Sequence, residues 1–282
     1  MQMGTVPDCT SCGRAIGDCP HLHLRSAHIY SGKEFSMTKD KITIIEELAS
    51  NAHVALNVQF CDGWVLKFSE GHTGRANSVN IMYPSQLDAL EKIKYCEECY
   101  AKQNIPCRFK LTDGDEAINE LLIERGYVEV NPSDVMSLDL SGTDIEMPDF
   151  DMVFYDKPVE EWLVPYFAYE GFSEKGQDVF RRMLDKVVID TTFAAIRMDG
   201  KVVALASSAG ERGMTMIQNV VVSPDYRGRG LGKAICQALL AKVKEQGYNT
   251  AYLQVVKSNT VALNLYNTLG FKKEYLYWYM NK

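Results

Sequence analysis

The C-terminal half of the chain alternates between two periodicities of apolar residues, which predict a defined order of helices and strands. Helical spacing relates Val159 to Trp162 in a first helix and Phe180 to Leu184 in a second. The dipeptide Asp199-Gly200 is a hairpin signal between two apolar runs, so we expect an antiparallel meander there. The expected elements are, in order, helices over 158–171 and 176–187, strands over 192–198, 202–209 and 214–222, a helix that ends at Gly247, a strand over 250–256, a helix over 260–269 and a strand over 274–280.

The N-terminal half carries a weaker copy of part of this pattern. Residues 115–127 align with 259–271, and in both an amphipathic helix ends in Gly followed by an aromatic residue. Gly126 and Gly270 are 144 positions apart, as are Leu121 and Leu265. The copy favours a duplication, and chance similarity of two amphipathic helices is the alternative interpretation. The other elements expected in this half are hairpin-like runs over 63–68 and 75–82, a helix over 86–103 and a strand from Val128.

We therefore expect three segments. Residues 1–36 form a leader rich in Cys and His, residues 37–140 a degenerate α/β unit, and residues 150–282 a complete one. The polar stretch 141–148 contains Gly and Pro and is the best linker candidate.

Composition narrows the range of partners. The chain has 282 residues, a formal net charge of −7 and a pI of about 5.4, which disfavours nucleic acid as a partner and weakly favours a cationic substrate. No apolar run approaches the ~20 residues of a membrane helix, and the N-terminus has no secretory pattern. We expect a cytoplasmic protein with reduced thiols and without membrane or nucleic-acid partners.

The strongest chemical signal is a glycine-rich loop between the strand that ends at Val222 and the next helix. Glycines allow backbone amides to approach a ligand closely, and a helix N-terminus attracts anions, so the pattern predicts a pyrophosphate site. A Walker motif is excluded because Ala234 follows Lys233, and the dinucleotide fingerprint needs its third glycine one place beyond Gly232.

The segment Arg227-x-x-Gly230-x-Gly232, followed by Asn259 and by Tyr266 ahead of Gly270-Phe271, resembles the GNAT superfamily of N-acetyltransferases. The resemblance is strong over 150–282 and weak in the first unit. It implies an α/β (α+β) fold with a central mixed, mostly antiparallel sheet, a splayed parallel strand pair and flanking helices, here in two tandem units. It also implies transfer of an acetyl group from acetyl-CoA to a primary amine of a small molecule or peptide, by direct attack in a ternary complex.

The resemblance assigns roles to individual positions. Tyr266 is the expected general acid for the leaving thiolate, and the Val222 amide is expected to polarise the thioester carbonyl. Asn259 either contacts the CoA arm or caps the last helix. Tyr166, Tyr169 and Glu170 are expected near the acceptor. The full set expected to bind acetyl-CoA is Val220, Val222, Arg227, Gly228, Arg229, Gly230, Leu231, Gly232, Lys233 and Asn259.

The general base stays open. Many relatives have a glutamate on the strand before the loop, where this chain has Gln218, so a water relay, Glu170 and Glu211 are the alternatives. All five histidines lie at or before His72, so none comes from the second unit. In the first unit Leu122 aligns with Tyr266, and no glycine-rich loop is present, so this unit is expected to be inactive.

Two alternative functions accompany this interpretation, and the leader leaves a separate question. The chain could be a module that senses acyl-CoA without turnover, as Gln218 suggests, or a transferase of a larger acyl or aminoacyl group. In the leader, Cys9, Cys12, Cys19 and His21 have zinc-ligand chemistry and form either a structural zinc site or part of a flexible segment.

Overall fold

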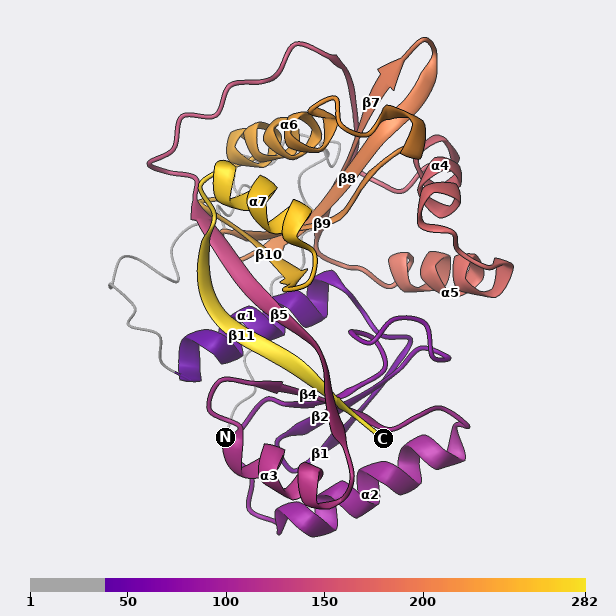
Figure 1. Cartoon of the computed structure of the whole chain (residues 1–282), viewed down its shortest axis with the longest axis vertical. Helices are drawn as coiled ribbons and strands as arrows, with labels where there is room; N and C mark the ends of the chain where they lie inside the picture. Colours follow the sequence, from indigo (N-terminus) through magenta and orange to yellow (C-terminus); the bar gives the residue numbers. More distant parts are fainter. Residues whose placement is uncertain (1–38) are drawn as a thin grey trace, which may run out of the picture. The chain divides into compact units, whose positions relative to one another are not determined.

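One sheet of eleven strands runs through the part of the chain that the computed structural model describes, residues 39–282 (Figure 1). The predicted zinc ligands Cys9, Cys12, Cys19 and His21 lie outside the described residues. The strand order is β1-β2-β3-β4-β11-β5-β10-β9-β8-β7-β6. The helices of four or more residues are α1 (Lys39–Ala52), α2 (Ala89–Lys102), α3 (Glu116–Glu124), α4 (Glu160–Glu170), α5 (Glu174–Leu184), α6 (Leu231–Glu245) and α7 (Thr260–Thr268). The strands are β1 (Asn57–Cys61), β2 (Trp64–Phe68), β3 (Val79–Ile81), β4 (Arg108–Thr112), β5 (Val128–Asp139), β6 (Asp151–Tyr155), β7 (Asp190–Met198), β8 (Lys201–Glu211), β9 (Met214–Val222), β10 (Thr250–Val256) and β11 (Lys272–Asn281).

The C-terminal half follows the predicted order of elements. Asp199 and Gly200, with φ of 52° and 72°, form the turn of the β7–β8 hairpin, as a left-handed two-residue turn requires. α6 ends at Glu245 with Gln246 as its C-cap, just before Gly247, and β9 and β10 have the predicted bounds. The sequence pattern missed β6, which precedes the two helices and pairs with β7.

In the N-terminal half the predicted strand over 75–82 shrinks to the three residues of β3. The residues before β3 form a loop because the Asn77 side chain bonds four backbone groups of that loop. The sequence pattern also missed α1, β1 and β4, and β5 extends the strand predicted at Val128 as far as Asp139.

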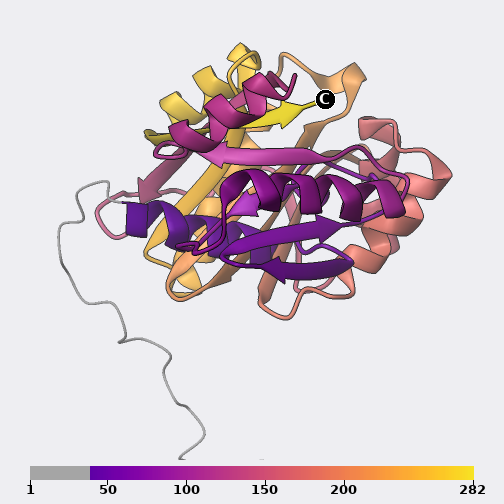
Figure 2. The same cartoon turned by 90° about the horizontal axis from the view of Figure 1, so that it is seen from below.

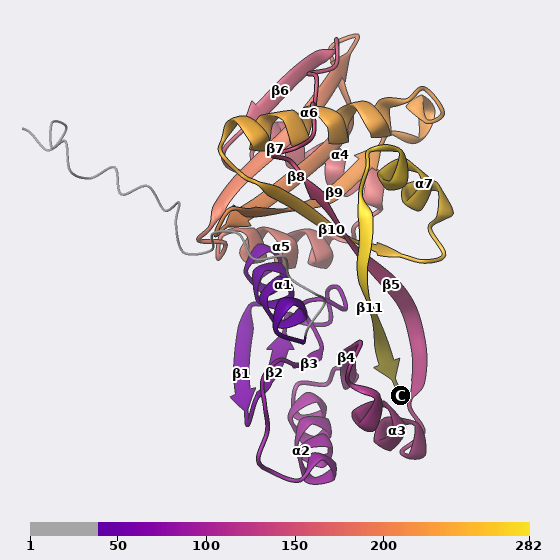
Figure 3. The same ribbon diagram turned by 90° about the vertical axis from the view of Figure 1, so that its left-hand side faces the viewer.

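Strands β5 and β11 lie at the centre of the sheet and exchange partners between the two halves. β5 pairs with β10 of the C-terminal half, and β11 pairs with β4 of the N-terminal half. Their register is symmetric under the 144-residue offset, since Lys272 faces Ser137 while Asn281 faces Val128. One continuous sheet is therefore present, and the structure does not separate the expected tandem units (Figure 3).

Helices cover both faces of the sheet. α6 packs with β7, β8, β9 and β10 around Ile235 and Leu239, and α7 lies beside it (Figure 1). On the other face α1 packs Ile45 and Leu48 against Met216 of β9 and Tyr252 of β10, so a helix of the N-terminal half covers strands of the C-terminal half. α2 packs against β2 and β4 at the far end of the sheet (Figure 2).

Candidate active site

The parallel strands β9 and β10 separate halfway along their length. Their pairing is confined to Met214–Met216 and Thr250–Tyr252, and β9 continues beyond it without a ladder partner on that side. A β-bulge accompanies the separation, because one residue of β8 between Leu205 and Ser207 spans two residues of β9. One of these two is Asn219, with φ of 56°. The backbone of the second half of β9 is thus free to bond an extended ligand.

The loop after β9 presents backbone amides at the N-terminus of α6. Gly228 and Gly230 have φ of 75° and 77°, so both positions need residues without a β-carbon. No side chain caps α6, which leaves its first amides free to bind an anion. A β-carbon at Gly232 would lie 3.1 Å from Cδ1 of Leu265, so glycine also permits the close approach of α7.

Three cations surround these amides. Arg227, Arg229 and Lys233 are exposed, and no carboxylate of the described chain forms an ion pair with them. The Arg229 guanidinium lies 4.9 Å from the ring centroid of Tyr226, and the Arg227 Nε donates to the Val222 carbonyl at 3.3 Å. Free amides, a helix N-terminus and unpaired cations at the end of an open strand fit the pyrophosphate and the extended arm of CoA.

Tyr266 extends from α7 into the core cluster that includes α6. Burial raises the pKa of its hydroxyl, and the nearby Cys236 thiol adds to this, so the group stays protonated at neutral pH. Among the described residues nothing hydrogen-bonds the hydroxyl, which leaves it free as a proton donor. Asn259 caps α7, since its side chain accepts from the Ala262 amide at 3.1 Å.

On the opposite face, α4 places its side chains against the bulge. The Tyr166 hydroxyl donates to Oδ1 of Asn219 at 3.0 Å, whereas the Tyr169 hydroxyl donates to the Val202 carbonyl at 2.6 Å. Burial raises the pKa of the Glu170 carboxyl, and the charge of Arg227 partly opposes that rise. Glu170 is the last residue of α4, one turn after Tyr166, and its raised pKa suits a proton acceptor.

Glu211, the other carboxylate considered as the general base, lies away from the bulge in β9. Glu211, at the end of β8, is bonded by Asn51 and Arg212, and the seven steps from Met214 to Val221 span roughly 23 Å of strand. Gln218 donates from Nε2 to the Ala52 carbonyl at 3.1 Å, and its Oε1 has no partner among the described residues.

Two histidines of the N-terminal half lie beside these groups, which sequence reasoning missed. His53 follows α1 and contacts Gln218, and burial lowers its pKa, so the imidazole is neutral at pH 7. The His72 ring centroid lies 5.0 Å from that of Phe172, between α4 and α5. The expectation that the second unit carries no histidine holds, but the fold brings two in from the first. No sequence signal marks them, because only tertiary packing brings α1 and the loop before β3 to β9.

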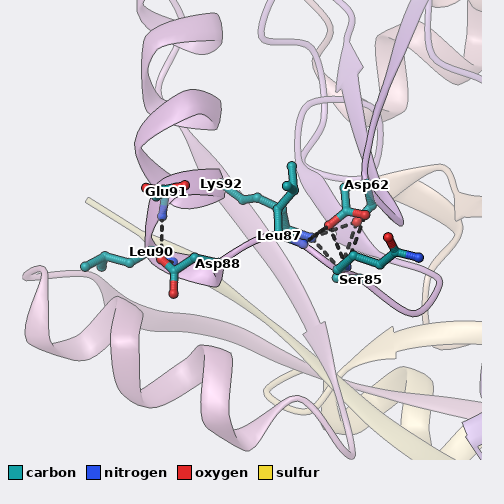
Figure 4. A network of polar contacts seen from close by, with 8 residues as sticks. Asp62, Ser85, Leu87, Asp88, Leu90, Glu91 and Lys92 are labelled. Carbon is teal, nitrogen blue, oxygen red and sulfur yellow. Dashed lines mark hydrogen bonds and ion pairs between the residues drawn. The ribbon is translucent and has the colours of Figure 1, made fainter.

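The N-terminal half has the same order of elements, with β3 parallel to β4 and a loop between β3 and α2. In the loop between β3 and α2, the backbone amides are hydrogen-bonded by side chains of the same half (Figure 4). The Asp62 carboxylate accepts from the amides of Gln86 and Leu87 at 2.8–3.1 Å, and Asp88 caps α2. Lys92, which is buried, donates to the Asp62 carbonyl at 2.7 Å. A carboxylate of the chain itself thus bonds the amides of this loop.

Two surface hollows lie apart from the strand separation. One of about 750 Å³ is lined by Asp190, Gln246 and Tyr248 near the start of β9, and one of about 350 Å³ by Val58 and Tyr95 of the N-terminal half. Among the described residues no group of three or more His, Cys, Asp or Glu side chains is arranged to hold a metal ion. None of the described helices is both long and apolar enough to cross a membrane.

The strand separation, the bulge and the glycine-rich loop define the class of N-acetyltransferases with the GNAT fold. Residues 39–280 match the family described as "Probable histone acetyltransferase Rv0428c C-terminal". The chain belongs to this family within the GNAT superfamily, and it is an acyltransferase.

Individual relatives agree with this assignment. Over 238 residues the chain is 25% identical to "Uncharacterized N-acetyltransferase YobR" of Bacillus subtilis, covering 82% of this chain and 95% of that protein. It is 33% identical over 78 residues to the ribosomal protein bS18-alanine N-acetyltransferase of Escherichia coli, covering 28% of this chain and 53% of that enzyme. The solved structure of a GCN5-related N-acetyltransferase from Kribbella flavida shares the fold, with a TM-score of 0.64, 17% identity and coverage of 85% of this chain and 95% of that one.

Proposed function

We propose that this protein transfers the acetyl group of acetyl-CoA to a primary amine of a small molecule or peptide, by direct attack of the amine in a ternary complex. The observation that carries the proposal is the free backbone of β9 leading into the uncapped N-terminus of α6. Bound acetyl-CoA would supply the activated thioester. The E. coli relative is named for acetylating an alanine of a ribosomal protein, which supports an amine acceptor.

The chain's own residues divide the remaining work. The backbone of Val220 and Val222 and the loop from Arg227 to Lys233 would hold the donor, and the Val222 amide would polarise the reacting carbonyl. Tyr266 would protonate the leaving thiolate, since its raised pKa keeps the proton on the hydroxyl until the thiolate forms. Glu170 would accept a proton from the ammonium group of the acceptor, directly or through water, so that the neutral amine attacks the thioester carbonyl.

We further propose that the N-terminal half is a degenerate repeat of the C-terminal one and binds no CoA. The symmetric register of β5 and β11 supports a duplication. Two features support the loss of CoA binding: Asp62 bonds the loop amides of that half, and Leu122 stands where Tyr266 stands in the other. The duplicated half would instead serve the acceptor side through α1 and the loop before β3.

Release of CoA from acetyl-CoA in the presence of an amine panel tests the proposal. We expect turnover with one amine class, and a decrease in kcat of roughly 10²-fold in Tyr266→Phe with little change in the acetyl-CoA KM. Tyr95→Phe, at an exposed tyrosine of the N-terminal half, is the matched control. Tight acetyl-CoA binding without turnover of any amine would favour the sensing module instead, which the amide at Gln218 allows.

A further inference from the structure

The segment from Ser69 to Asn77, here named the clasp loop, is held together by one buried side chain. Asn77 is 4% exposed, accepts from two amides of the loop and donates to two of its carbonyls, at 2.6–3.0 Å. Glu70 and Thr73 have φ of 53° and 60°, a left-handed conformation that is costly for such residues. Strain of this kind persists where the surrounding contacts over-determine it, and it is concentrated at functional sites.

The clasp loop belongs to the N-terminal half but packs on α5 of the C-terminal half. Ala76 is fully buried with Val179 and Met183 of α5. Glu70 pairs with Arg182 of the same helix at 2.6 Å. This packing fixes the position of the remaining side chains of the loop relative to α4 and to the bulge in β9.

Arg75 lies at the middle of the clasp loop, half-buried and without a counter-ion. Within residues 39–282 its guanidinium forms neither an ion pair nor a hydrogen bond. Its neighbours in the loop contact the groups around it: the Thr73 hydroxyl lies 3.0 Å from Nε2 of His53, and a β-carbon at Gly74 would lie 3.2 Å from the Tyr279 ring. The charge of Arg75 contributes to the lowered pKa of His53 and partly opposes the raised pKa of Tyr166 and Tyr279. Glu170 acts on the Tyr166 hydroxyl in the opposite direction, so a cation and a carboxylate both influence the tyrosine that bonds the bulge.

Buried polar atoms without partners lie on the clasp loop and on strands β9 and β11. Nε2 of His72, Oε1 of Gln218 and the Tyr279 hydroxyl have no hydrogen-bond partner among the described residues. Buried polar atoms are nearly always paired, and a partly buried guanidinium is stabilised by an anion. Each of these atoms is available to a polar ligand, and Arg75 offers that ligand a positive charge that no carboxylate within residues 39–282 pairs with.

Resting on the proposed acetyl transfer, we propose that Arg75 pairs with a carboxylate of the acceptor, so that the acceptor is an amine that also carries an anionic group. Amino acids and peptides with a free C-terminus have this chemistry. The Tyr166 hydroxyl lies between the two ends of such a molecule, with Arg75 at the carboxylate and Glu170 at the amine. The acceptor site is then complete only with the clasp loop, which gives the N-terminal half a direct part in specificity.

The test uses pairs of amines that differ only in the carboxylate. Each amino acid is compared with its decarboxylated amine, and each dipeptide with its C-terminal amide, at fixed acetyl-CoA. For wild type we expect kcat/KM at least 10-fold higher for the carboxylated member of each accepted pair. In Arg75→Gln most of that advantage is lost, a fall of roughly 10- to 10²-fold as expected for a charge-assisted hydrogen bond, whereas Arg75→Lys recovers part of it. A preference seen only in the amino-acid pairs indicates a free amino acid as the acceptor, and one seen in the dipeptide pairs indicates a peptide.

Lys102→Gln is the control, because it removes an exposed positive charge at the end of α2 that forms no ion pair within residues 39–282. If the protein binds acetyl-CoA yet shows no preference for carboxylated amines, or if Arg75→Gln lowers activity equally on both members of a pair, the inference is wrong and the proposed function stands. If the folded protein does not bind acetyl-CoA, the proposed function itself is overturned. Measurement of acetyl-CoA binding before the kinetics distinguishes the two failures.

Discussion

Lys67 on β2 is a buried cation next to the acceptor side, and its replacement by Met gives a prediction with a defined magnitude. The side chain is 6% exposed and donates to Oγ of Ser50 on α1 at 2.7 Å. Burial, together with the charges of Lys110 and Arg75, lowers its pKa from 10.5 to about 7, and the charge of Glu46 partly opposes this.

The pKa shift fixes how stability depends on pH. Between about pH 7 and 10.5 the unfolded chain holds a proton on Lys67 that the folded chain has lost, so the free energy of unfolding rises with pH. One proton contributes about 1.4 kcal/mol per pH unit, and the whole shift corresponds to roughly 4–5 kcal/mol. Below pH 7 both states are protonated and the full cost of burying the ammonium is present. Lys67→Met removes that cost, so we expect it to stabilise the protein at pH 6.5 by about 1–3 kcal/mol.

Urea denaturation from pH 6.5 to 9 measures the difference between wild type and Lys67→Met. The advantage of the variant should shrink by about 1 kcal/mol per pH unit above pH 7.5. Lys102→Met, at an exposed lysine of α2, should show no such slope. A pH-independent difference, or one that grows with pH, would refute a lowered pKa at Lys67.

Two further substitutions test the loops after β9 and β3. Gly232→Val should weaken acetyl-CoA binding by at least about 10-fold and cost roughly 1–3 kcal/mol of stability, because a β-carbon at this position would lie 3.1 Å from Leu265. Calorimetry measures the affinity and urea denaturation the stability. An unchanged affinity would contradict the close packing. Asp62→Ala should lower the midpoint of thermal unfolding, because two loop amides lose their acceptor. Its acetyl-CoA affinity should stay within about two-fold of that of the wild type. A large loss of affinity would indicate that the N-terminal half takes part in CoA binding.

The elements of the C-terminal half were predictable because their signals are local. The Asp199-Gly200 turn, the alternation through β9 and the glycines before α6 each depend on neighbouring residues. The strand over 75–82 was wrong for the opposite reason. Its apolar residues fit a strand, but the buried side chain of Asn77 competes for the backbone groups and keeps Arg75 in a loop.

The glycine-rich loop and the helix that carries Tyr166 and Glu170 could be located from the sequence, whereas the clasp loop could not. Arg227, Gly230 and Gly232 form a contiguous motif, whereas His72 and Arg75 reach β9 only through packing of the clasp loop on α5. The exchange of β5 and β11 left no signal either, because a strand carries the same pattern whichever neighbour it pairs with. The 144-residue offset indicated a repeat without indicating that the repeats share a sheet.

Calorimetric titration of the folded protein with acetyl-CoA tests the central claim most directly. We expect saturable binding of one acetyl-CoA per chain, because of the two corresponding loops within residues 39–282 the one before α6 has free amides and unpaired cations, whereas Asp62 bonds the amides of the other. Two equivalent sites per chain would contradict the closed N-terminal loop, and the absence of binding would contradict the acetyl-CoA-dependent function as a whole.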